Sequence, residues 1–209
     1  FFVAAAVSTS QAGQPVVGAF PHLAGTGLDG LNFCGLEELD ALFVAGQLLG
    51  LLTATPHGAT AELLDGVLGR AEAAGAVPRA VDLSADFRFA DVARYAAVYG
   101  KPHAAPQRQA AFTCAVPELG PLRPAGHAVQ PGCFTTAVTL AAYPLYALDL
   151  AEGPLFASAV TGSSGSGRKL GAGTHHPERR SNFNAYSPLA HRHEAEMRMF
   201  LGQARGGEE

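Results

Sequence analysis

The sequence is poor in cysteine. Its 209 residues include Cys34, Cys114 and Cys133, an odd number of widely spaced cysteines without a CxxC pair. This spacing argues against a disulfide scaffold and against a structural zinc site, so no metal site is predicted. Because cysteines stay reduced in the cytosol, a cytoplasmic location is expected.

Charge is also scarce. Only 15% of the residues are charged, the formal net charge is -4, and the basic residues are scattered. These features argue against a nucleic-acid partner and against a polybasic membrane patch. No apolar run reaches transmembrane length, and the opening "FFVAAAV" lacks the basic region of a signal peptide. The first residue is not Met and "GQARGGEE" reads as the stop after a helix, so we expect a fragment.

The first half of the sequence alternates between apolar runs and a helical pattern. Buried strands are predicted at Phe1–Val7 and within Ala41–Thr55. Leucines at helical spacing predict an amphipathic helix over Thr60–Ala74, and a short strand follows at Ala80–Leu83. This order is typical of a parallel α/β sheet, in which ligands bind at the carboxyl ends of the strands. Polar residues follow the last of these strands: Ser84, Asp86 and Arg88.

The second half predicts further elements. "DVARYAAVYG" indicates a short helix closed by Gly100, and "GHAVQPG" contains a short strand. A helix over Phe134–Ala147 is expected to kink or end at Pro144. A strand at Pro154–Val160 and a last helix at Glu194–Leu201 complete the prediction.

Cys133 lies in "QPGCFTTA", between a Pro–Gly corner and the predicted start of a helix. Unpaired N–H groups and the helix dipole at such a position stabilise a thiolate, which is the nucleophilic form of cysteine. A small residue filling a packed turn would give the same pattern. The stretch alone leaves both interpretations open.

Two polar stretches follow in the last third of the sequence. The Gly/Ser loop Thr161–Gly167, with Arg168 and Lys169 next to it, suits phosphates or other anions, although a flexible linker looks the same. The second stretch holds four histidines: His175, His176, His191 and His193. They could bind zinc or provide a general acid or base, or they could belong to a solvated loop. Glu196, three residues after His193, could share a helical face with it and hold an imidazole in one tautomer.

Several motifs together change this reading. "ATPHG", "AVDLSADFR", "VPEL", "QPGCFTTA", "TGSSGSGRK", "THHPERRSN" and "AYSPLAHRHEAE" occur in the order found in one family. The sequence resembles N-acetyl-gamma-glutamyl-phosphate reductase, the NADP-dependent third enzyme of arginine biosynthesis. The related reductase of carrier-protein lysine biosynthesis has the same layout. The resemblance covers about Val7 to Glu196.

The resemblance implies an α/β fold, in which a partial Rossmann-like dinucleotide-binding domain is followed by part of an α+β, semialdehyde dehydrogenase-like substrate domain. The expected domains are residues 1–132 and 133–209. The family's first strand and glycine-rich turn, which seat the cofactor diphosphate, have no counterpart in the sequence. The complete protein is expected to be a homo-oligomer.

The resemblance also implies a reaction and its residues. Cys133 attacks the acyl phosphate, inorganic phosphate leaves, and NADPH reduces the resulting thioester to N-acetylglutamate semialdehyde. His191 is the expected acid or base, with His193 and Glu196 as supports. The expected substrate contacts are Arg168, Lys169 and Arg192. The expected NADP contacts are Ser8, Ser10, Pro56, His57, Gly58, Ser164 and Gly165.

Alternatives remain open at this point. The substrate could be carrier-bound aminoadipyl phosphate, although "PGCF" and "SSGSGRK" favour the acetylglutamyl compound. A truncated, non-catalytic paralogue would keep the fold without holding cofactor. A zinc module built from Cys133 and the histidines would lack compact ligand pairs. Aspartate-semialdehyde dehydrogenase has the same chemistry but lacks the "HRHxxE" motif.

Overall fold

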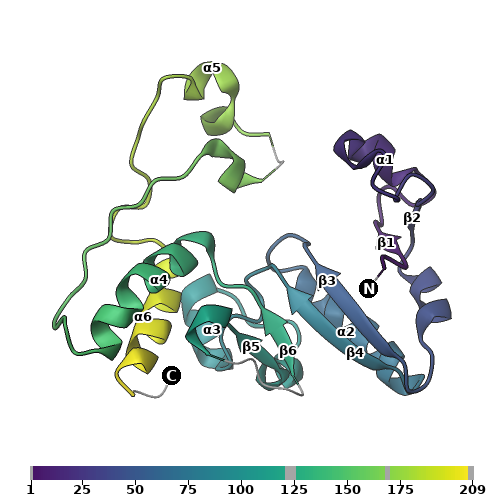
Figure 1. The fold of residues 1–209 in the computed structure, drawn as a ribbon, viewed down its shortest axis with the longest axis horizontal. Helices are drawn as coiled ribbons and strands as arrows, with labels where there is room; N and C mark the ends of the chain where they lie inside the picture. Colours follow the sequence, from purple (N-terminus) through teal and green to yellow (C-terminus); the bar gives the residue numbers. More distant parts are fainter. Residues whose placement is uncertain (1, 121–125, 168–169, 207–209) are drawn as a thin grey trace.

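A computed structural model describes residues 2–120, 126–167 and 170–206 (Figure 1). Its main feature is a four-stranded parallel sheet in the order β3-β4-β6-β5. The strands are β3 (Leu48–Thr53), β4 (Val77–Asp82), β5 (Phe112–Cys114) and β6 (His127–Val129). The predicted parallel α/β architecture is therefore confirmed, and the carboxyl ends of these strands share one edge of the sheet.

Helix α2 (Thr60–Ala73) connects β3 to β4 and packs on the sheet. Leu64 and Leu68 point inward and are fully buried, as their helical spacing predicts. They join a core in which the rings of Phe87 and Phe112 stack with centroids 3.9 Å apart. This core holds the loop after β4 against the sheet.

Strand β3 differs from its prediction. The apolar run Ala41–Thr55 forms a strand only from Leu48, because the preceding residues form the 3-10 helix η2 (Glu37–Leu42) and a turn. Within the described residues β3 lies at the edge of its sheet, and Leu48 and Leu52 are 60% and 75% exposed. The run is therefore not a strand buried on both faces.

The N-terminal residues form a small unit of their own (Figure 1). Strand β1 (Ala6–Val7) pairs in parallel with β2 (Phe33–Cys34), apart from the main sheet. The predicted buried strand Phe1–Val7 is too long, because among the described residues only Ala6 and Val7 pair and Phe2 is 86% exposed. The unit also contains α1 (Val16–Ala19) and the 3-10 helix η1 (Pro21–Leu23).

Helix α3 (Val92–Tyr99) confirms its prediction at both ends. The Asp91 carboxylate accepts a hydrogen bond from the Ala93 N–H at 2.8 Å, and Gly100 ends the helix at a φ of 70°. The 3-10 helices η3 (Pro106–Ala111) and η4 (Pro117–Leu119) lie between α3 and β6. Tyr95 of α3 packs in a core with Met199 of the last helix.

Helices α4 (Cys133–Ala147) and α6 (His193–Ala204) pack side by side next to the sheet (Figure 1). Helix α4 begins one residue earlier than predicted. Pro144 lies inside α4 and does not end it, since the helix continues to Ala147. Helix α6 extends the predicted Glu194–Leu201 by one residue at its start and three at its end.

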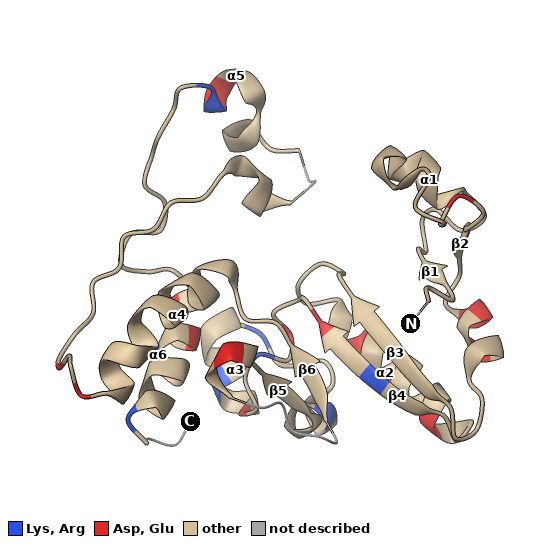
Figure 2. Ribbon diagram, viewed as in Figure 1, with Lys and Arg blue, Asp and Glu red and all other residues tan. Residues whose placement is uncertain are grey.

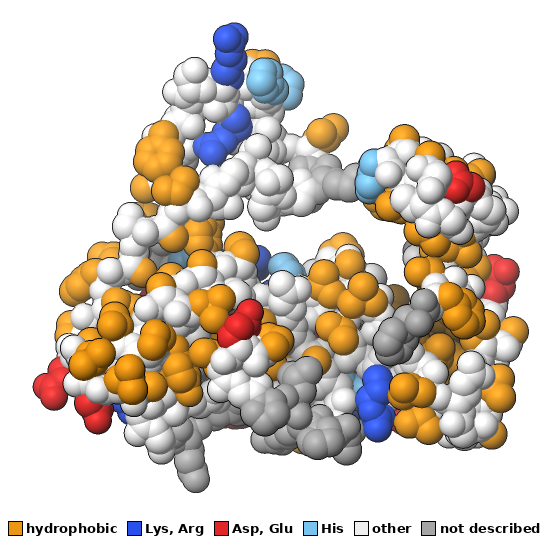
Figure 3. Space-filling view, in the orientation of Figure 1, with side chains coloured by type: hydrophobic (Ala, Val, Ile, Leu, Met, Phe, Trp, Pro, Cys, Tyr) orange, Lys and Arg blue, Asp and Glu red, His pale blue; other side chains and the backbone are white. Residues whose placement is uncertain are grey.

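Residues 152–167 and 170–190 form an extended arm that leaves α4 and returns to α6 (Figure 1). Its short elements are η5 (Ser163–Ser166), η6 (Ala172–Thr174) and α5 (His176–Arg179). The predicted strand at Pro154–Val160 is wrong, because this segment has no strand to pair with in the part of the chain that the structure describes. Figure 3 shows hydrophobic side chains along the arm, where Phe156, Phe183 and Leu189 are more than 80% exposed.

The charged residues are spread thinly over the fold (Figure 2). Lysines and arginines occur on several elements and do not gather on one face of the ribbon. Among the described residues, no helix has the length and apolar character needed to cross a membrane. The same residues contain no cluster of three or more potential metal ligands.

Candidate active site

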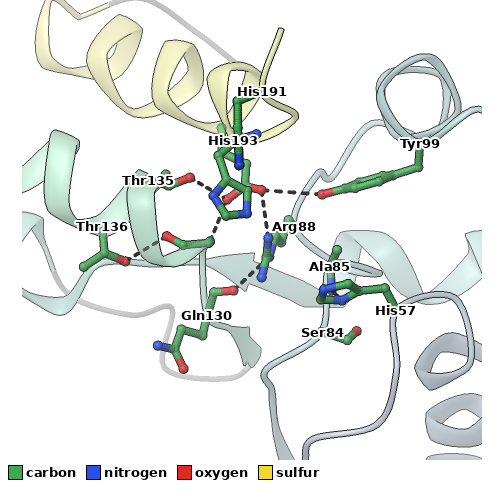
Figure 4. Close-up of polar contacts among 12 residues, drawn as sticks. His57, Ser84, Ala85, Arg88, Tyr99, Gln130, Thr135, Thr136, His191 and His193 are labelled. Carbon is green, nitrogen blue, oxygen red and sulfur yellow. Dashed lines mark hydrogen bonds and ion pairs between the residues drawn. The ribbon is translucent and has the colours of Figure 1, made fainter. Parts of the chain in front are cut away.

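The candidate site lies where the first turns of α4 and α6 meet the loop after β4 (Figure 4). Glu196 of α6 is fully buried at this junction. Its Oε2 accepts hydrogen bonds from the Gly132 N–H at 2.7 Å and from the Thr135 hydroxyl at 2.9 Å. A buried carboxylate on α6 therefore fixes the start of α4.

Arg88 connects this hydrogen-bond network to the sheet. Its Nη1 donates to Glu196 Oε1 at 2.9 Å, and its Nε donates to the Gln130 carbonyl at 3.0 Å. Arg88 is 5% exposed and Glu196 is fully buried, so both partners of the ion pair are buried. Tyr99 also donates to Glu196 Oε1 at 3.5 Å, and burial together with this carboxylate raises the pKa of Tyr99.

These partners correct the role predicted for Glu196. The sequence suggested that its carboxylate would hold an imidazole in one tautomer. Among the described residues, the hydrogen-bond partners of Glu196 are Arg88, Tyr99, Gly132 and Thr135, and none is a histidine. Glu196 therefore supports the backbone next to Cys133 and does not orient a ring.

Cys133 is the first residue of α4, and Gly132 is its N-cap residue. The thiol is free and exposed, whereas Gly132 and Thr135 on either side are held by Glu196. The helix starts one residue before the predicted Phe134, so the Cys133 sulfur lies at the helix end where N–H groups lack intrahelical partners. The site thus presents an accessible thiol on a fixed backbone.

His193 closes the space beside this turn. A Cβ atom at Gly132 would overlap the His193 ring, so any other residue there would displace that ring. The His193 side chain is buried, and its Nδ1 has no hydrogen-bond partner among the described residues. Burial lowers the pKa of His193 to about 4, so the ring is neutral near neutral pH.

His191 lies next to His193, with ring centroids 4.5 Å apart (Figure 4). Its ring contacts Phe134 edge-on with centroids 5.4 Å apart, which places it beside the residue that follows Cys133. His191 Nδ1 accepts a hydrogen bond from the His193 N–H at 3.2 Å. Burial and the nearby charge of Arg192 lower the pKa of His191.

Arg192 lies between these two histidines in the chain and is the N-cap residue of α6. Its guanidinium has no hydrogen bond or ion pair within the described part of the chain. Its charge nevertheless lowers the pKa of His57, His191 and His193, so it acts on both sides of the site. Arg192 is therefore a cation available for an anionic ligand, whereas Arg88 is already paired.

The "TPHG" loop lies at the carboxyl end of β3, opposite His191 and His193 (Figure 4). Pro56 opens the turn in which His57 and Gly58 follow. His57 Nδ1 accepts a hydrogen bond from the Ala85 N–H at 3.0 Å. Burial, Arg192 and Arg88 lower the pKa of His57. The ring is thus held by its Nδ1, which leaves Nε2 for other contacts.

The N–H groups at the start of α2 are already paired. The Asp86 carboxylate accepts hydrogen bonds from Gly58, Thr60 and Ala61 at 2.6, 3.1 and 3.0 Å. The polar residues that follow β4 were predicted to face a ligand, but Asp86 instead caps a helix from within the protein. The backbone N–H of Gly58 is therefore not available for a cofactor in this arrangement.

The remaining predicted contacts lie elsewhere. Ser8 and Ser10 are in the N-terminal unit, and Ser164 and Gly165 are in η5 of the arm, so the structure does not bring them to the Glu196 network (Figure 1). Arg168 and Lys169 lie outside the described residues. The site residues that the sequence brought together and the structure also gathers are Cys133, His191, Arg192, His193 and Glu196.

Arg88 and Thr135 are site residues that the sequence did not assign. The "DLSADFR" motif drew attention to Arg88 as a polar residue after a strand. Nothing in its spacing connects it to Glu196, which lies 108 positions further on. Thr135 lies two positions after Cys133, within the motif "QPGCFTTA", and this proximity was the available signal.

Residues 133–209 match the family described as "Semialdehyde dehydrogenase, dimerisation domain". This match assigns the part of the chain that contains α4, the arm and α6 to the semialdehyde dehydrogenase class. The chain is also 38% identical to an N-acetyl-gamma-glutamyl-phosphate reductase of Nitrosococcus oceani, over 91% of this chain and 53% of the relative. It is 37% identical to an enzyme of the same name from Pseudomonas syringae pv. syringae, over 96% of this chain and 56% of the relative.

A third relative bears a different name. The chain is 37% identical to a [LysW]-L-2-aminoadipate 6-phosphate reductase of Deinococcus radiodurans, over 93% of this chain and 53% of that protein. The chain is thus similar to N-acetyl-gamma-glutamyl-phosphate reductases over most of its own length, as its motifs indicated. It spans about half the length of the curated relatives it matches.

Proposed function

We propose that the protein to which this chain belongs reduces N-acetyl-gamma-glutamyl phosphate to N-acetylglutamate semialdehyde through a thioester on Cys133. One observation carries this proposal: an exposed thiol is the first residue of α4, and a buried carboxylate fixes that turn. The identity to reductases that bear this name supports the choice of substrate.

In the first step the Cys133 thiolate attacks the carbonyl carbon of the acyl phosphate. The C–S bond forms, the C–O bond to phosphate breaks, and inorganic phosphate leaves with the bonding pair and takes a proton from water. A thioester remains on Cys133. After reduction of the thioester, the C–S bond breaks, the aldehyde leaves, and the thiolate is regenerated.

Arg192 is the proposed contact for the negative charge of the substrate. Its guanidinium is unpaired within the described residues and lies close enough to lower the pKa of His191 and His57. A guanidinium binds phosphate or carboxylate through two parallel hydrogen bonds. A groove of about 990 Å³ between the arm and the helices α4 and α6, lined by Phe134 and His191, gives room for the acyl chain.

NADPH is the proposed reductant, and when bound it would supply the hydride. The carboxyl end of the sheet fits the reacting end of such a cofactor, because His57 keeps its Nε2 unpaired among the described residues and Arg192 adds positive charge. Pro56, His57 and Gly58 would flank it there. The diphosphate has no comparable cradle in these residues, since Asp86 already binds the N–H groups of Gly58, Thr60 and Ala61.

A second candidate substrate is carrier-bound aminoadipyl phosphate. The relative from Deinococcus radiodurans, named for that substrate, is nearly as similar to this chain as the acetylglutamyl reductases are. Both substrates offer the same acyl phosphate to Cys133, so the chemistry of the site serves either. Comparing the two as acyl donors distinguishes these candidates.

The proposal extends to the organisation of the protein. We propose that residues 1–132 form the dinucleotide-binding part and residues 133–209 the first part of the catalytic domain, in a cytoplasmic enzyme. The description of the matched family as a dimerisation domain supports a homo-oligomer. Exposed apolar side chains on the arm, such as Phe156 and Phe183, support contact with further protein surface.

The test is formation of an acyl adduct from N-acetyl-gamma-glutamyl phosphate, detected by intact mass without any cofactor. We expect an adduct on the unsubstituted chain and on the matched control Cys34→Ser, but none on Cys133→Ser. An adduct on Cys133→Ser would contradict the thioester route. Phosphate-dependent reduction of NADP with N-acetylglutamate semialdehyde then tests the cofactor separately.

A further inference from the structure

His103 follows α3 in the chain, and no motif in the sequence gave it a role. Its side chain is 6% exposed, and both of its ring nitrogens have partners. The Ala105 N–H donates to Nδ1 at 3.0 Å, and Nε2 lies 2.8 Å from the Asp86 carbonyl oxygen. His103 therefore connects the segment after α3 to the loop after β4 by a bond inside the protein.

These two contacts determine where the proton of the His103 ring lies. A backbone N–H can only donate, so Nδ1 keeps its lone pair. The neutral ring then carries its proton on Nε2, which donates to the Asp86 carbonyl. Burial and the charge of Lys101 lower the pKa of His103, while Asp86 opposes them. The net decrease favours the neutral ring.

The His103 ring also packs against the residue that precedes Arg88. The ring centroids of His103 and Phe87 are 5.0 Å apart in an edge-on contact. Tyr95 of α3 makes a second edge-on contact with the imidazole, with centroids 4.7 Å apart. The imidazole therefore holds Asp86 and Phe87, the two residues directly before Arg88. This fixes the direction in which the arginine leaves the loop.

We infer that His103 is a positioning residue that aims Arg88 at the start of α4. From the loop after β4, Arg88 pairs with Glu196 at 2.9 Å. Glu196 in turn holds the N–H of Gly132, the residue before Cys133. The catalytic consequence of this inference rests on the proposed thioester function and deepens it, because the turn of the nucleophile then depends on a histidine from another element.

The same loop also serves the opposite side of the site. The Asp86 carboxylate accepts a hydrogen bond from the Gly58 N–H of the "TPHG" turn at 2.6 Å. His57 of that turn accepts a hydrogen bond from the Ala85 N–H at 3.0 Å. By holding one carbonyl of the loop, His103 stabilises both the "TPHG" turn and the start of α4.

The proton position can be measured on the unsubstituted chain without substrate or cofactor. Two-bond proton–nitrogen correlation spectra of the ¹⁵N-labelled chain distinguish the two neutral tautomers and the imidazolium of His103. We expect a proton on Nε2 alone near neutral pH. A proton on Nδ1, in either the neutral or the charged ring, would overturn the inference, because the bond from the Ala105 N–H could then not exist.

The positioning role is tested by hydrogen exchange at the backbone N–H of Gly132. His103→Leu removes the donor to the Asp86 carbonyl, whereas His103→Gln places an amide N–H near the position of Nε2. We expect exchange at Gly132 to be about 10-fold or more faster in His103→Leu. In His103→Gln it should stay close to the rate of the unsubstituted chain. Equal rates in the two variants would overturn the inference, since the Nε2–H bond would then not hold the loop.

His127→Leu is the matched control for a general loss of stability. His127 is also buried, its Nδ1 accepts the Ala80 N–H at 3.1 Å, and its ring packs against Phe112 with centroids 4.8 Å apart. It is the first residue of β6, at the end of the strand away from the site. We expect little change at Gly132 in this variant. An increase as large as in His103→Leu would overturn the inference.

The rate of adduct formation on Cys133 tests the catalytic consequence. We expect it to fall about 10- to 100-fold in His103→Leu and to stay unchanged in His127→Leu. An unchanged rate in His103→Leu would show that the nucleophile does not depend on His103. If the unsubstituted chain forms no adduct, the thioester function itself fails, whereas exchange at Gly132 still decides whether His103 positions the turn.

Discussion

Arg88 and Glu196 form an ion pair inside the protein, with Nη1 and Oε1 2.9 Å apart. Arg88 follows the central strand β4, and Glu196 lies in the first turns of α6. The carboxylate reaches on to Gly132, so the pair joins the sheet to the start of α4. The reactive end of α4 therefore depends on a contact between residues far apart in the sequence.

Replacing Glu196 by Gln should be strongly destabilising. The change leaves the Arg88 guanidinium buried without a counter-charge, which typically costs about 3–5 kcal/mol of unfolding free energy. The matched control is Glu194→Gln. Glu194 likewise pairs with an arginine, Arg198 of α6, but both partners are largely exposed. The control should cost no more than about 1 kcal/mol in urea unfolding. Equal losses in the two variants would contradict the importance of the buried pair.

Gly132→Ala should destabilise the protein because its Cβ would overlap the His193 ring. Adding a methyl group to such a packed position costs about 1–3 kcal/mol. Gly202 of α6 has no atom within 4 Å of its Cβ position, so Gly202→Ala should stabilise the helix by about 0.5–1 kcal/mol. Thermal unfolding of both variants checks that Gly132→Ala destabilises the protein and that Gly202→Ala stabilises it. A neutral Gly132→Ala would mean that His193 does not pack on this turn.

Stability should decrease as the solution becomes acidic. The folded state lowers the pKa of His193 to about 4 from an ordinary value of 6.5, so the unfolded chain binds more protons between these values. The contribution is present above about pH 6.5 and is lost as the pH falls toward about 4. Burial also lowers the pKa of His57, His103, His127 and His191, so each of these four histidines changes stability with pH in the same direction.

The contribution of His193 to this pH dependence of stability is measured by substituting the residue. In His193→Gln the side chain no longer titrates, so the unfolding free energy should depend less steeply on pH in this window. Urea unfolding midpoints across the window, for the unsubstituted chain and the variant, provide the comparison. The same slope in both proteins would show that His193 is not held neutral by the fold.

Asp86→Ala should cost about 2–4 kcal/mol, because the buried carboxylate is the acceptor for three backbone N–H groups. Asp91 caps α3 through one hydrogen bond at 2.8 Å, so Asp91→Ala is a matched control expected to cost about 1 kcal/mol. Urea unfolding of the two variants gives the ratio of their losses in unfolding free energy. Similar losses would indicate that the bonds of Asp86 contribute no more than one ordinary cap.

Local patterns in the sequence predicted the helices well. The spacing of Leu64 and Leu68 places both in the core of α2, and Gly100 ends α3 where a left-handed residue is needed. Cys133 follows a Pro–Gly corner, and the structure begins α4 there. In each case the determining interactions lie within a few residues of one another, so a local pattern carries the information.

The strands and the site depended on contacts that no local pattern contains. Pro154–Val160 and Phe2–Val7 are apolar enough for strands, yet only Ala6 and Val7 form one, because a strand forms only where another strand pairs with it. The buried partner of Arg88 lies more than a hundred positions away, and only the packing of α6 against α4 brings it near. The motifs named the site residues, but the fold determined which of them bind one another.

The exposed edge of β3 has a consequence for the behaviour of the chain in solution. On the side away from β4, the backbone N–H and C=O groups of β3 face no neighbouring strand among the described residues. The exposed Leu48 and Leu52 make this rim of the sheet hydrophobic. Such a rim is a template on which strands of other molecules can add, so concentrated samples should form β-rich aggregates. A lysine in place of Leu52 would put a charge on the rim and protect the chain against that growth.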